Sequence, residues 1–321
     1  MNDYLLRLAL CAALGIGLLG CPEADDDDSA QADDDVADDD TTEYAEGCIT
    51  VNGAVPGYAR LQDAVFMAAD GDVINLCADT FVGSVTVDRP LTIVGAADGA
   101  TVVEGDTNEM AITVTSPDVT LAQLTVLSSR NAVVAEGASG LTLDHLTVTE
   151  SGQFGLSLSN SVATVHGCLF SGHPFAAIDA QNSVLTLTSS ELLDNVASGE
   201  GGALYLASCS DVDLGLQQVH GNEAATGGGA FLQGQRVDGG WFYGNYAEDG
   251  GGAYLDAATL VGTLLTENLA SAAGGGVAMD NGAALLGCDV QLNIARSGGG
   301  GALQGDDCST GAHPLTGART T

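Results

Sequence analysis

The chain has 321 residues and a formal net charge of −36, and its seven basic residues are all arginine. Proteins bind nucleic acid chiefly through Lys and Arg that neutralise phosphates, so this charge argues against a nucleic-acid partner. Glycine occurs 45 times and aromatic residues make up 5% of the chain, which favours many thin, tightly turned layers over a two-layer domain filled by large side chains.

Residues 1–20 have the pattern of a secretory signal peptide, with Arg7 followed by an apolar run too short to span a bilayer as a mature helix. The run leads into Leu18-Leu19-Gly20-Cys21, which resembles the bacterial lipobox. The resemblance implies cleavage before Cys21, acylation of that cysteine and anchoring through the lipid. Pro22 after the cysteine favours the outer membrane by the same resemblance, with the protein either periplasmic or exposed at the surface. The alternative is an ordinary signal peptide with a coincidental cysteine.

Residues 21–46 are expected to form a disordered acidic tether that begins at the lipidated cysteine. The stretch 22–46 carries 13 acidic side chains and no basic one, so it cannot bury enough apolar surface to fold. Three roles stay open for it: a spacer, an export signal, and a reservoir for Ca²⁺. The export reading rests on Gln31-Ala32-Asp33-Asp34, which resembles signals on surface-exposed lipoproteins of some bacterial groups.

Residues 47–116 are expected to hold an N-terminal cap and the first coils of a solenoid. The stretch from Tyr58 to Ala69 places apolar residues on one helical face, and a short strand from Val73 to Leu76 follows it. With the short strands after it, this segment resembles the start of right-handed parallel β-helix proteins, where a helix covers the open end of the first coil. A cap is needed there because the terminal coil has unpaired backbone groups.

Residues 117–307 contain repeats of 22 to 27 residues, each with short alternating strands and no helical pattern. We therefore predict an all-β fold, a right-handed parallel β-helix of about ten coils. Five repeats in the second half of the chain each have one asparagine, which we call the anchor. These anchors are expected to form a ladder from coil to coil: Asn195, Asn222, Asn245, Asn268 and Asn293. Asparagine also tolerates left-handed backbone angles. Glycines such as Gly202, Gly229 and Gly252 are expected at tight corners with close backbone approach.

The repeats also resemble those of chlamydial polymorphic outer membrane proteins. The similarity rests on Phe242-Tyr243-Gly244-Asn245 and on the Gly-Gly-Ala-aliphatic element from Gly201 to Leu204. It implies a β-helical module with adhesive or surface roles. The remaining segment, 308–321, is expected to be an irregular or truncated tail, and an uncapped last coil would favour self-association there.

Six cysteines remain outside the signal peptide and the lipidation site. An even number in a secreted chain indicates pairing, and we expect a disulfide between Cys48 and Cys77. A second between Cys288 and Cys308 is suggested by their separation of about one coil. The other two, Cys168 and Cys209, are either paired or buried free thiols.

Two sets of residues align across successive coils when the glycines are superimposed. Gln233, Asp256 and Asp280 form an acidic line that Asp306 would extend, and these carboxylates either bind Ca²⁺ or form a screened acidic edge. The second set contains Leu204, Phe231 and Tyr254, which belong either to the core or to an exposed strip for sugar stacking.

No group of residues in the sequence has the composition of a catalytic centre, so no catalytic residue is assigned. A lyase acting on acidic polysaccharide needs a basic residue, yet Arg130 and Arg236 are far apart in the chain, and hydrolysis needs paired carboxylates. His145, His166 and His220 read as isolated side chains, and His173 as a turn histidine. We expect a non-catalytic cell-envelope lipoprotein with an adhesive, glycan-binding or structural role and no required cofactor. The alternative is a carbohydrate-active enzyme, a Ca²⁺-dependent lyase more than a hydrolase.

Overall fold

The computed structural model describes residues 48–54, 57–97, 99–127 and 129–297, and the backbone of two further strands. All of them belong to one unit, Glu43–Thr321. The expected signal peptide, lipidated Cys21 and acidic tether lie outside the described residues, as do Asp306, Cys308 and most of the expected tail.

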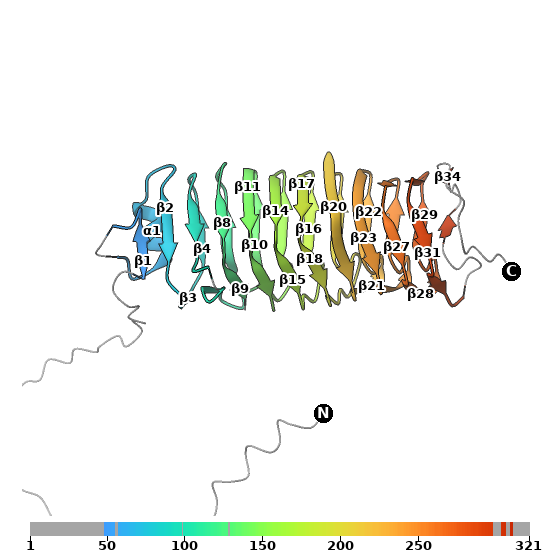
Figure 1. Ribbon diagram of the computed structural model, residues 1–321, viewed down its shortest axis with the longest axis horizontal. Helices are drawn as coiled ribbons and strands as arrows, with labels where there is room; N and C mark the ends of the chain where they lie inside the picture. The colour runs from blue at the N-terminus through green and yellow to red at the C-terminus, as the bar shows by residue number, and fades with distance from the viewer. Residues whose placement is uncertain are drawn as a thin grey trace, which may run out of the picture. The chain divides into compact units, whose positions relative to one another are not determined.

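The described chain is a solenoid of stacked coils, in which each strand pairs with the equivalent strand of the next coil (Figure 1). A ten-stranded parallel sheet takes one strand from each coil: β4 (Val85–Val87), β7 (Met110–Val114), β10 (Asn131–Glu136), β13 (Leu156–Ser159), β16 (Ile178–Gln181), β19 (Leu204–Ala207), β22 (Ala230–Gln233), β25 (Ala253–Asp256), β29 (Val277–Asp280) and β33 (Leu303–Gly305). The expected fold of about ten parallel β coils is therefore confirmed.

The remaining strands form two other sheets. A twenty-stranded sheet contains β1 (Ile49–Val51), β2 (Val73–Leu76), β3 (Thr80–Val82), β5 (Thr92–Val94), β6 (Val102–Glu104), β8 (Thr120–Ala122), β9 (Thr125–Leu127), β11 (Ser139–Asp144), β12 (Thr147–Thr149), β14 (Val162–His166), β15 (Leu169–Ser171), β17 (Val184–Thr188), β18 (Glu191–Leu193), β20 (Asp211–His220), β23 (Arg236–Tyr243), β26 (Thr259–Val261), β27 (Leu264–Thr266), β30 (Ala284–Leu286), β31 (Asp289–Gln291) and β34 (Ser309–Thr310). A four-stranded sheet contains β21 (Glu223–Thr226), β24 (Tyr246–Asp249), β28 (Leu269–Ala273) and β32 (Ile294–Ala295).

The core runs along the inside of the coils as one continuous apolar cluster. Alternation along each strand decides which side chains enter it: in β11, Leu141 and Leu143 are fully buried, while Thr142 between them points outward. Burying a leucine side chain stabilises a fold by about 1.5–3 kcal/mol. Since most strands contribute only one or two such residues, the fold depends on stacking many thin layers.

The asparagine ladder is present and lies in the protein interior. The side-chain oxygen of each anchor after Asn195 accepts hydrogen bonds from the backbone N–H and the Nδ2 of the anchor one coil earlier, at 2.8–3.0 Å. The expected left-handed angle, however, falls on a different residue. Positive φ occurs at the residue just before each anchor: Asp194, Gly221, Gly244, Glu267 and Leu292. The anchor itself has no positive φ, because it contributes to the corner through the hydrogen bonds of its side-chain amide and not through its backbone angle.

The glycine corners bring successive coils into backbone contact, as expected. A Cβ added at Gly202, Gly229 or Gly252 would lie within 2.6 Å of a carbonyl oxygen of the next coil. The alignment based on these glycines is wrong by one residue in the repeat that begins at Gly201, because Leu204, and not Ala203 directly after the glycines, pairs with Ala230. One fewer glycine precedes the strand in that repeat, which shifts the register.

The N-terminal cap consists of a short helix and an antiparallel strand. Helix α1 (Leu61–Met67) buries Leu61, Ala64 and Val65, and β1 pairs antiparallel with β2. The helix is shorter than the expected span because Arg60 has an extended backbone and no side chain caps the first turn. The described residues contain no helix long and apolar enough to cross a membrane.

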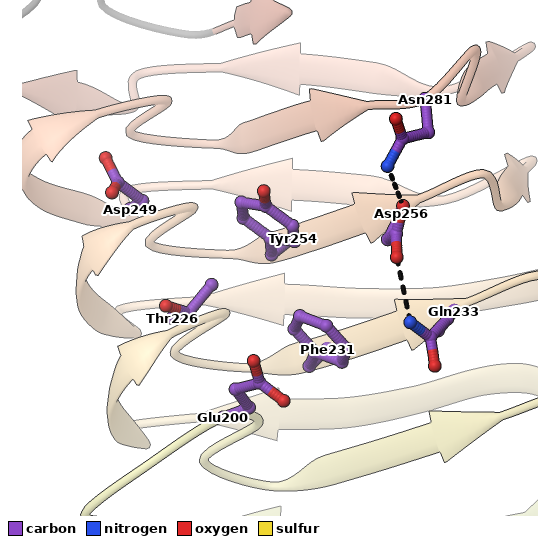
Figure 2. Close-up of a pocket in the computed structure, with 8 residues that line it drawn as sticks. All are labelled: Glu200, Thr226, Phe231, Gln233, Asp249, Tyr254, Asp256 and Asn281. Carbon is purple, nitrogen blue, oxygen red and sulfur yellow. Dashed lines mark hydrogen bonds between the residues drawn. The ribbon is translucent and has the colours of Figure 1, made fainter.

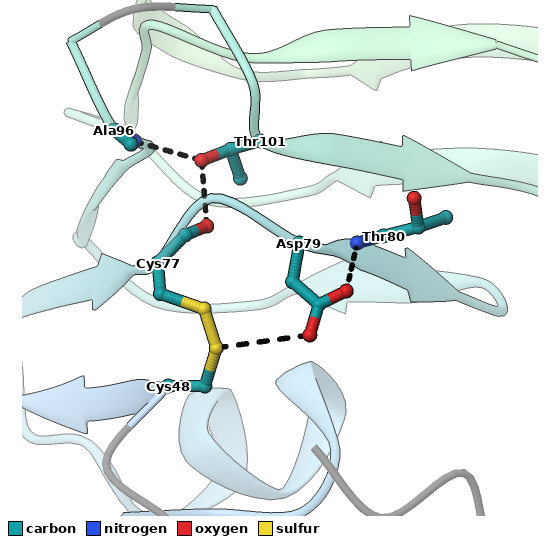
Figure 3. Close-up of a disulfide and its surroundings, with 6 residues drawn as sticks. All are labelled: Cys48, Cys77, Asp79, Thr80, Ala96 and Thr101. Carbon is teal, nitrogen blue, oxygen red and sulfur yellow. Dashed lines mark hydrogen bonds between the residues drawn. A yellow bond between two sulfur atoms is a disulfide. The ribbon is translucent and has the colours of Figure 1, made fainter. Parts of the chain in front are cut away.

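The disulfide between Cys48 and Cys77 is present and joins the residue before β1 to the residue after β2, beside Asp79 (Figure 3). Thr101, in the following coil, donates a hydrogen bond to the carbonyl oxygen of Cys77 at 2.8 Å. Cys168 and Cys209 are buried free thiols, and burial raises the pKa of Cys168 to about 11. Cys288 has no disulfide partner among the described residues, and its expected partner, Cys308, lies outside them, so that pairing stays a prediction.

Candidate functional site

Two neighbouring hollows, of about 350 and 310 Å³, open over the outer face of the ten-stranded sheet. Glu200 lines both, so we treat them as one groove. The first hollow is drawn in Figure 2 and is lined by Glu200, Thr226, Phe231, Gln233, Asp249, Tyr254, Asp256 and Asn281. The second is lined by Phe154, Phe175, Ala176, Asp179, Gln181, Ala197, Gly199, Glu200 and Tyr205.

The floor of the groove is a stack of three aromatic rings, one from each of three successive coils. Tyr205, Phe231 and Tyr254 occupy paired positions of β19, β22 and β25. Their ring centroids are 5.4 Å apart, and the planes are within 6° of parallel. The fully buried Leu204 belongs to the core, so its predicted place in this set was wrong and Tyr205 takes that place. The set is an outer-face strip and not part of the apolar core.

The stack has two open ends. Because the rings face one another along the solenoid, the middle ring, Phe231, is covered on both faces and is only 5% exposed. Beyond Tyr205 the paired residue is Asp179, and beyond Tyr254 it is the small Ala278. The outward face of each terminal tyrosine is therefore the surface on which an apolar sugar face or another flat group would stack.

A polar line runs beside the rings, and one of its carboxylates, Asp256, is contacted by two side-chain amides. The two oxygens of Asp256 accept hydrogen bonds from Gln233, at 2.8 Å, and from Asn281, at 2.5 Å, which keeps the pKa of Asp256 below its ordinary value. Asp280 pairs with Asp256 in register and accepts a hydrogen bond from the Tyr254 hydroxyl, which raises the pKa of that tyrosine. These contacts stabilise the carboxylates without a cation, so the structure adds no support for Ca²⁺ between Asp256 and Asp280.

The other side of the groove carries a third line of residues, Glu200, Thr226 and Asp249, which pair coil by coil. Asp179, at the lower end of the ring stack, is 7% exposed. Burial raises its pKa, while hydrogen bonds from Gln181 and Ser157 act in the opposite direction. Burial, followed by the charges of Glu200 and Asp179, raises the pKa of Tyr205.

The groove has no basic side chain among the residues that line its two hollows. Arg236 is engaged by Asp238, which it contacts through two hydrogen bonds, and Arg130 donates to Gln153 at 3.1 Å. The groove is therefore suited to uncharged or cationic ligands and unfavourable for polyanions.

The histidines are less isolated than the sequence suggested. His145 and His166 lie with ring centroids 5.4 Å apart. His220 stacks on Tyr243 and lies 2.6 Å from a carboxylate oxygen of Glu191. His145 and His166 are 21 residues apart, close to the 22 residues of one coil at this corner, and that spacing was the signal in the sequence that would have brought them together.

His173 is buried, in contrast to the expected turn histidine. It lies at the start of the asparagine ladder, where its backbone N–H donates to Asn195. Its ring contacts the Ser151 hydroxyl at 2.6 Å, and burial lowers its pKa to about 4. We assign it a structural role.

Comparison with known proteins agrees with this architecture. The family model described as the right-handed β-helix region matches residues 110–310. The solenoid is similar to an alginate lyase from Paenibacillus sp. strain FPU-7, with 14% identity, a TM-score of 0.50, and coverage of 78% of this chain and 96% of that one. It is also similar to the pectate lyase Pel9A, with 12% identity, a TM-score of 0.42, and coverage of 81% and 73%. No curated protein matches the sequence. At these identities the likeness concerns the fold alone.

Proposed function

We propose that this chain, which belongs to the right-handed β-helix family, is a non-catalytic glycan-binding module that uses the groove on its ten-stranded sheet. The observation that carries the proposal is the outward stack of Tyr205, Phe231 and Tyr254, flanked on both sides by hydrogen-bonding side chains. Glycan sites combine apolar faces with a few oriented polar groups, and this groove offers both.

The charge of the groove selects the class of glycan. Its lining contains Asp179, Glu200, Asp249 and Asp256 and no arginine, so a uronate polymer would meet carboxylates without a compensating cation. An uncharged polysaccharide, or one with amino sugars, avoids that repulsion. The groove therefore favours binding over lyase action on acidic polysaccharide, which needs a basic residue beside the sugar.

The second candidate is a glycoside hydrolase, and one observation favours it. Burial raises the pKa of Asp179, which is the direction that a general acid requires, and Glu200 lines the same hollow as a second carboxylate. We rank hydrolysis below binding because Asp179 already accepts contacts from Gln181, at 3.3 and 3.4 Å, within the protein.

The proposal includes a location at the cell envelope. The lipobox-like sequence before Cys21 and the acidic tether after it support a lipid-anchored protein of the outer membrane, where a bound glycan would be held near the surface. Metabolic labelling with a palmitate analogue, followed by Cys21→Ala, tests the anchor. Loss of label and release from the membrane fraction are expected, whereas unchanged membrane association would contradict the anchor.

The binding test is affinity electrophoresis of the purified chain through gels that contain an uncharged glucan, an amino-sugar polymer or a polyuronate. We expect retardation by one of the first two and none by the polyuronate. Tyr205→Ala and Tyr254→Ala should weaken binding about tenfold, which corresponds to one aromatic contact of about 1.4 kcal/mol. Tyr243→Ala is the matched control, because Tyr243 is a half-exposed tyrosine on the twenty-stranded sheet.

Three results would overturn the proposal. The first is absence of retardation by every glycan, and the second is equal loss of binding in the Tyr243 control. The third is release of new reducing ends that depends on Asp179, measured with Asp179→Asn, which would establish the hydrolase instead.

A further inference from the structure

A column of left-handed residues forms one corner of the solenoid, between the paired strands of the twenty-stranded sheet. The column contains Gln123, His145, Gly167 and Ser189, all with φ between 52° and 62°. In β11 and β14, Asp144 pairs in register with His166. The stacking therefore places Asp144 and His145 of one coil against His166 and Gly167 of the next.

Three potential metal ligands meet at this corner. One donor atom each from Asp144, His145 and His166 lies within 4.8 Å of the other two. The carboxylate Oδ1 of Asp144 is 2.8 Å from Nδ1 of His145, and the two imidazole rings meet edge to face with an interplanar angle of 79°. Small side-chain rotations would bring all three donors around one ion.

The surroundings hold both rings in place. A Cβ at Gly167 would lie 2.9 Å from Nε2 and Cδ2 of His145, so the ring of His145 occupies space that only glycine leaves free. Nδ1 of His166 is hydrogen-bonded to the Thr188 hydroxyl at 3.0 Å, which leaves Nε2 as the nitrogen available to a metal. Metal-binding histidines commonly have their second nitrogen fixed in this way.

We propose that Asp144, His145 and His166 form a surface site for a divalent transition ion of the Zn²⁺ type, with water completing the coordination. Two imidazoles and one carboxylate suit Zn²⁺, Ni²⁺ and Cu²⁺, whereas Ca²⁺ and Mg²⁺ prefer all-oxygen sites. The side chains of His145 and Asp144 are 59% and 39% exposed, so the ion reaches the site from solvent and joins two successive coils. This site is separate from the glycan groove, which lies on the ten-stranded sheet.

The test is a calorimetric titration of the metal-free full chain with Zn²⁺. The buffer contains enough Ca²⁺ to occupy weak sites made of carboxylates alone. We expect one ion per chain and a loss of affinity of at least about tenfold in His145→Gln and in His166→Gln. His220→Gln is the matched control, because His220 also contacts a carboxylate, Glu191, but belongs to no three-ligand group among the described residues. It should bind Zn²⁺ like the parent.

Two further measurements use a different readout. With one equivalent of Cu²⁺, electron paramagnetic resonance should show coupling to two imidazole nitrogens in the parent and to one in either histidine variant. Gly167→Ala should weaken binding, since it displaces the ring of His145 while retaining all three ligands. Equal Zn²⁺ affinity in the parent and in a variant that combines His145→Gln with His166→Gln, or Cu²⁺ spectra without nitrogen coupling in the parent, would overturn the proposal.

Discussion

Replacing one asparagine in the middle of the ladder tests what holds the coils together. Asn245 is 1% exposed and has a neighbouring anchor on each side. In Asn245→Ala, the side-chain amide is removed while the backbone hydrogen bonds of the strands remain. We expect Asn245→Ala to be one of the most destabilising single substitutions in the described chain, although it removes little apolar contact.

The magnitude follows from the hydrogen bonds that disappear. The side-chain oxygen of Asn245 accepts from the backbone N–H and Nδ2 of Asn222, each at 3.0 Å. Its Nδ2 donates to the carbonyl of Val219 at 2.8 Å and to Asn268 at 3.0 Å. At about 1 kcal/mol for each of these four bonds, the free energy of unfolding should fall by about 4 kcal/mol. Two of the partners keep other hydrogen bonds in the variant: Asn222 Nδ2 still donates to the carbonyls of Leu192 and His220, and the Asn268 oxygen still accepts from the backbone N–H of residue 245.

The assay combines urea denaturation with native-state hydrogen exchange, because a solenoid does not always unfold in one step. Protection should fall first in peptides around residues 219–225 and 242–250. Asn75→Ala is the control, since Asn75 is exposed on β2, and its effect should stay within about 0.5 kcal/mol. A loss below about 1 kcal/mol for Asn245→Ala, or exchange no faster than in the control, would refute the reasoning.

Three other perturbations have expected outcomes of their own. Burial lowers the pKa of His173 from 6.5 to about 4, so the unfolded chain takes up the proton first as the pH falls; the folded state should lose up to about 3 kcal/mol between these values. His173→Asn should flatten that slope in denaturation curves, and an unchanged slope would contradict the assignment. The disulfide joins cysteines 29 positions apart, so Cys77→Ser should cost about 3–4 kcal/mol, and a reductant should lower the thermal midpoint of the parent but not of the variant. Gly252→Ala places a Cβ 2.6 Å from a carbonyl oxygen, whereas Gly199→Ala enters open space; thermal melts should show a loss only in the former, and equal midpoints would argue against tight corner packing.

Much of the solenoid could be predicted because its signals are local and repeated. A ladder anchor such as Asn222 is preceded by a turn residue and an apolar strand in every repeat, so the period and the stacking follow from spacing alone. The register did not follow as reliably. The repeat that begins at Gly201 has a shorter glycine run, and superimposing glycines moved Leu204 into a position that belongs to Tyr205.

The site was harder to predict because it depends on which face a side chain takes. Alternation showed that Phe231 and its partners share a face, but the choice between core and surface depends on the packing of the interior. The structure resolves it: Leu232 fills the core, so Phe231 faces out. Likewise, His145 and His166 meet only because one corner of the coil recurs at nearly the same spacing.

The ladder also has a direction. From Asn195 to Asn268, each side-chain amide donates to the amide of the next anchor, so the three middle anchors both accept and donate within the ladder. The amide dipoles are therefore aligned head to tail and polarise one another, as in other hydrogen-bonded chains. Such an array has two unlike ends: its oxygen end is met by the backbone N–H of His173, while its N–H end points toward the later coils. The oxygen end lies in the middle of the solenoid, several coils after the N-terminal cap, so the alignment acts inside the protein, where each amide strengthens the next hydrogen bond of the row.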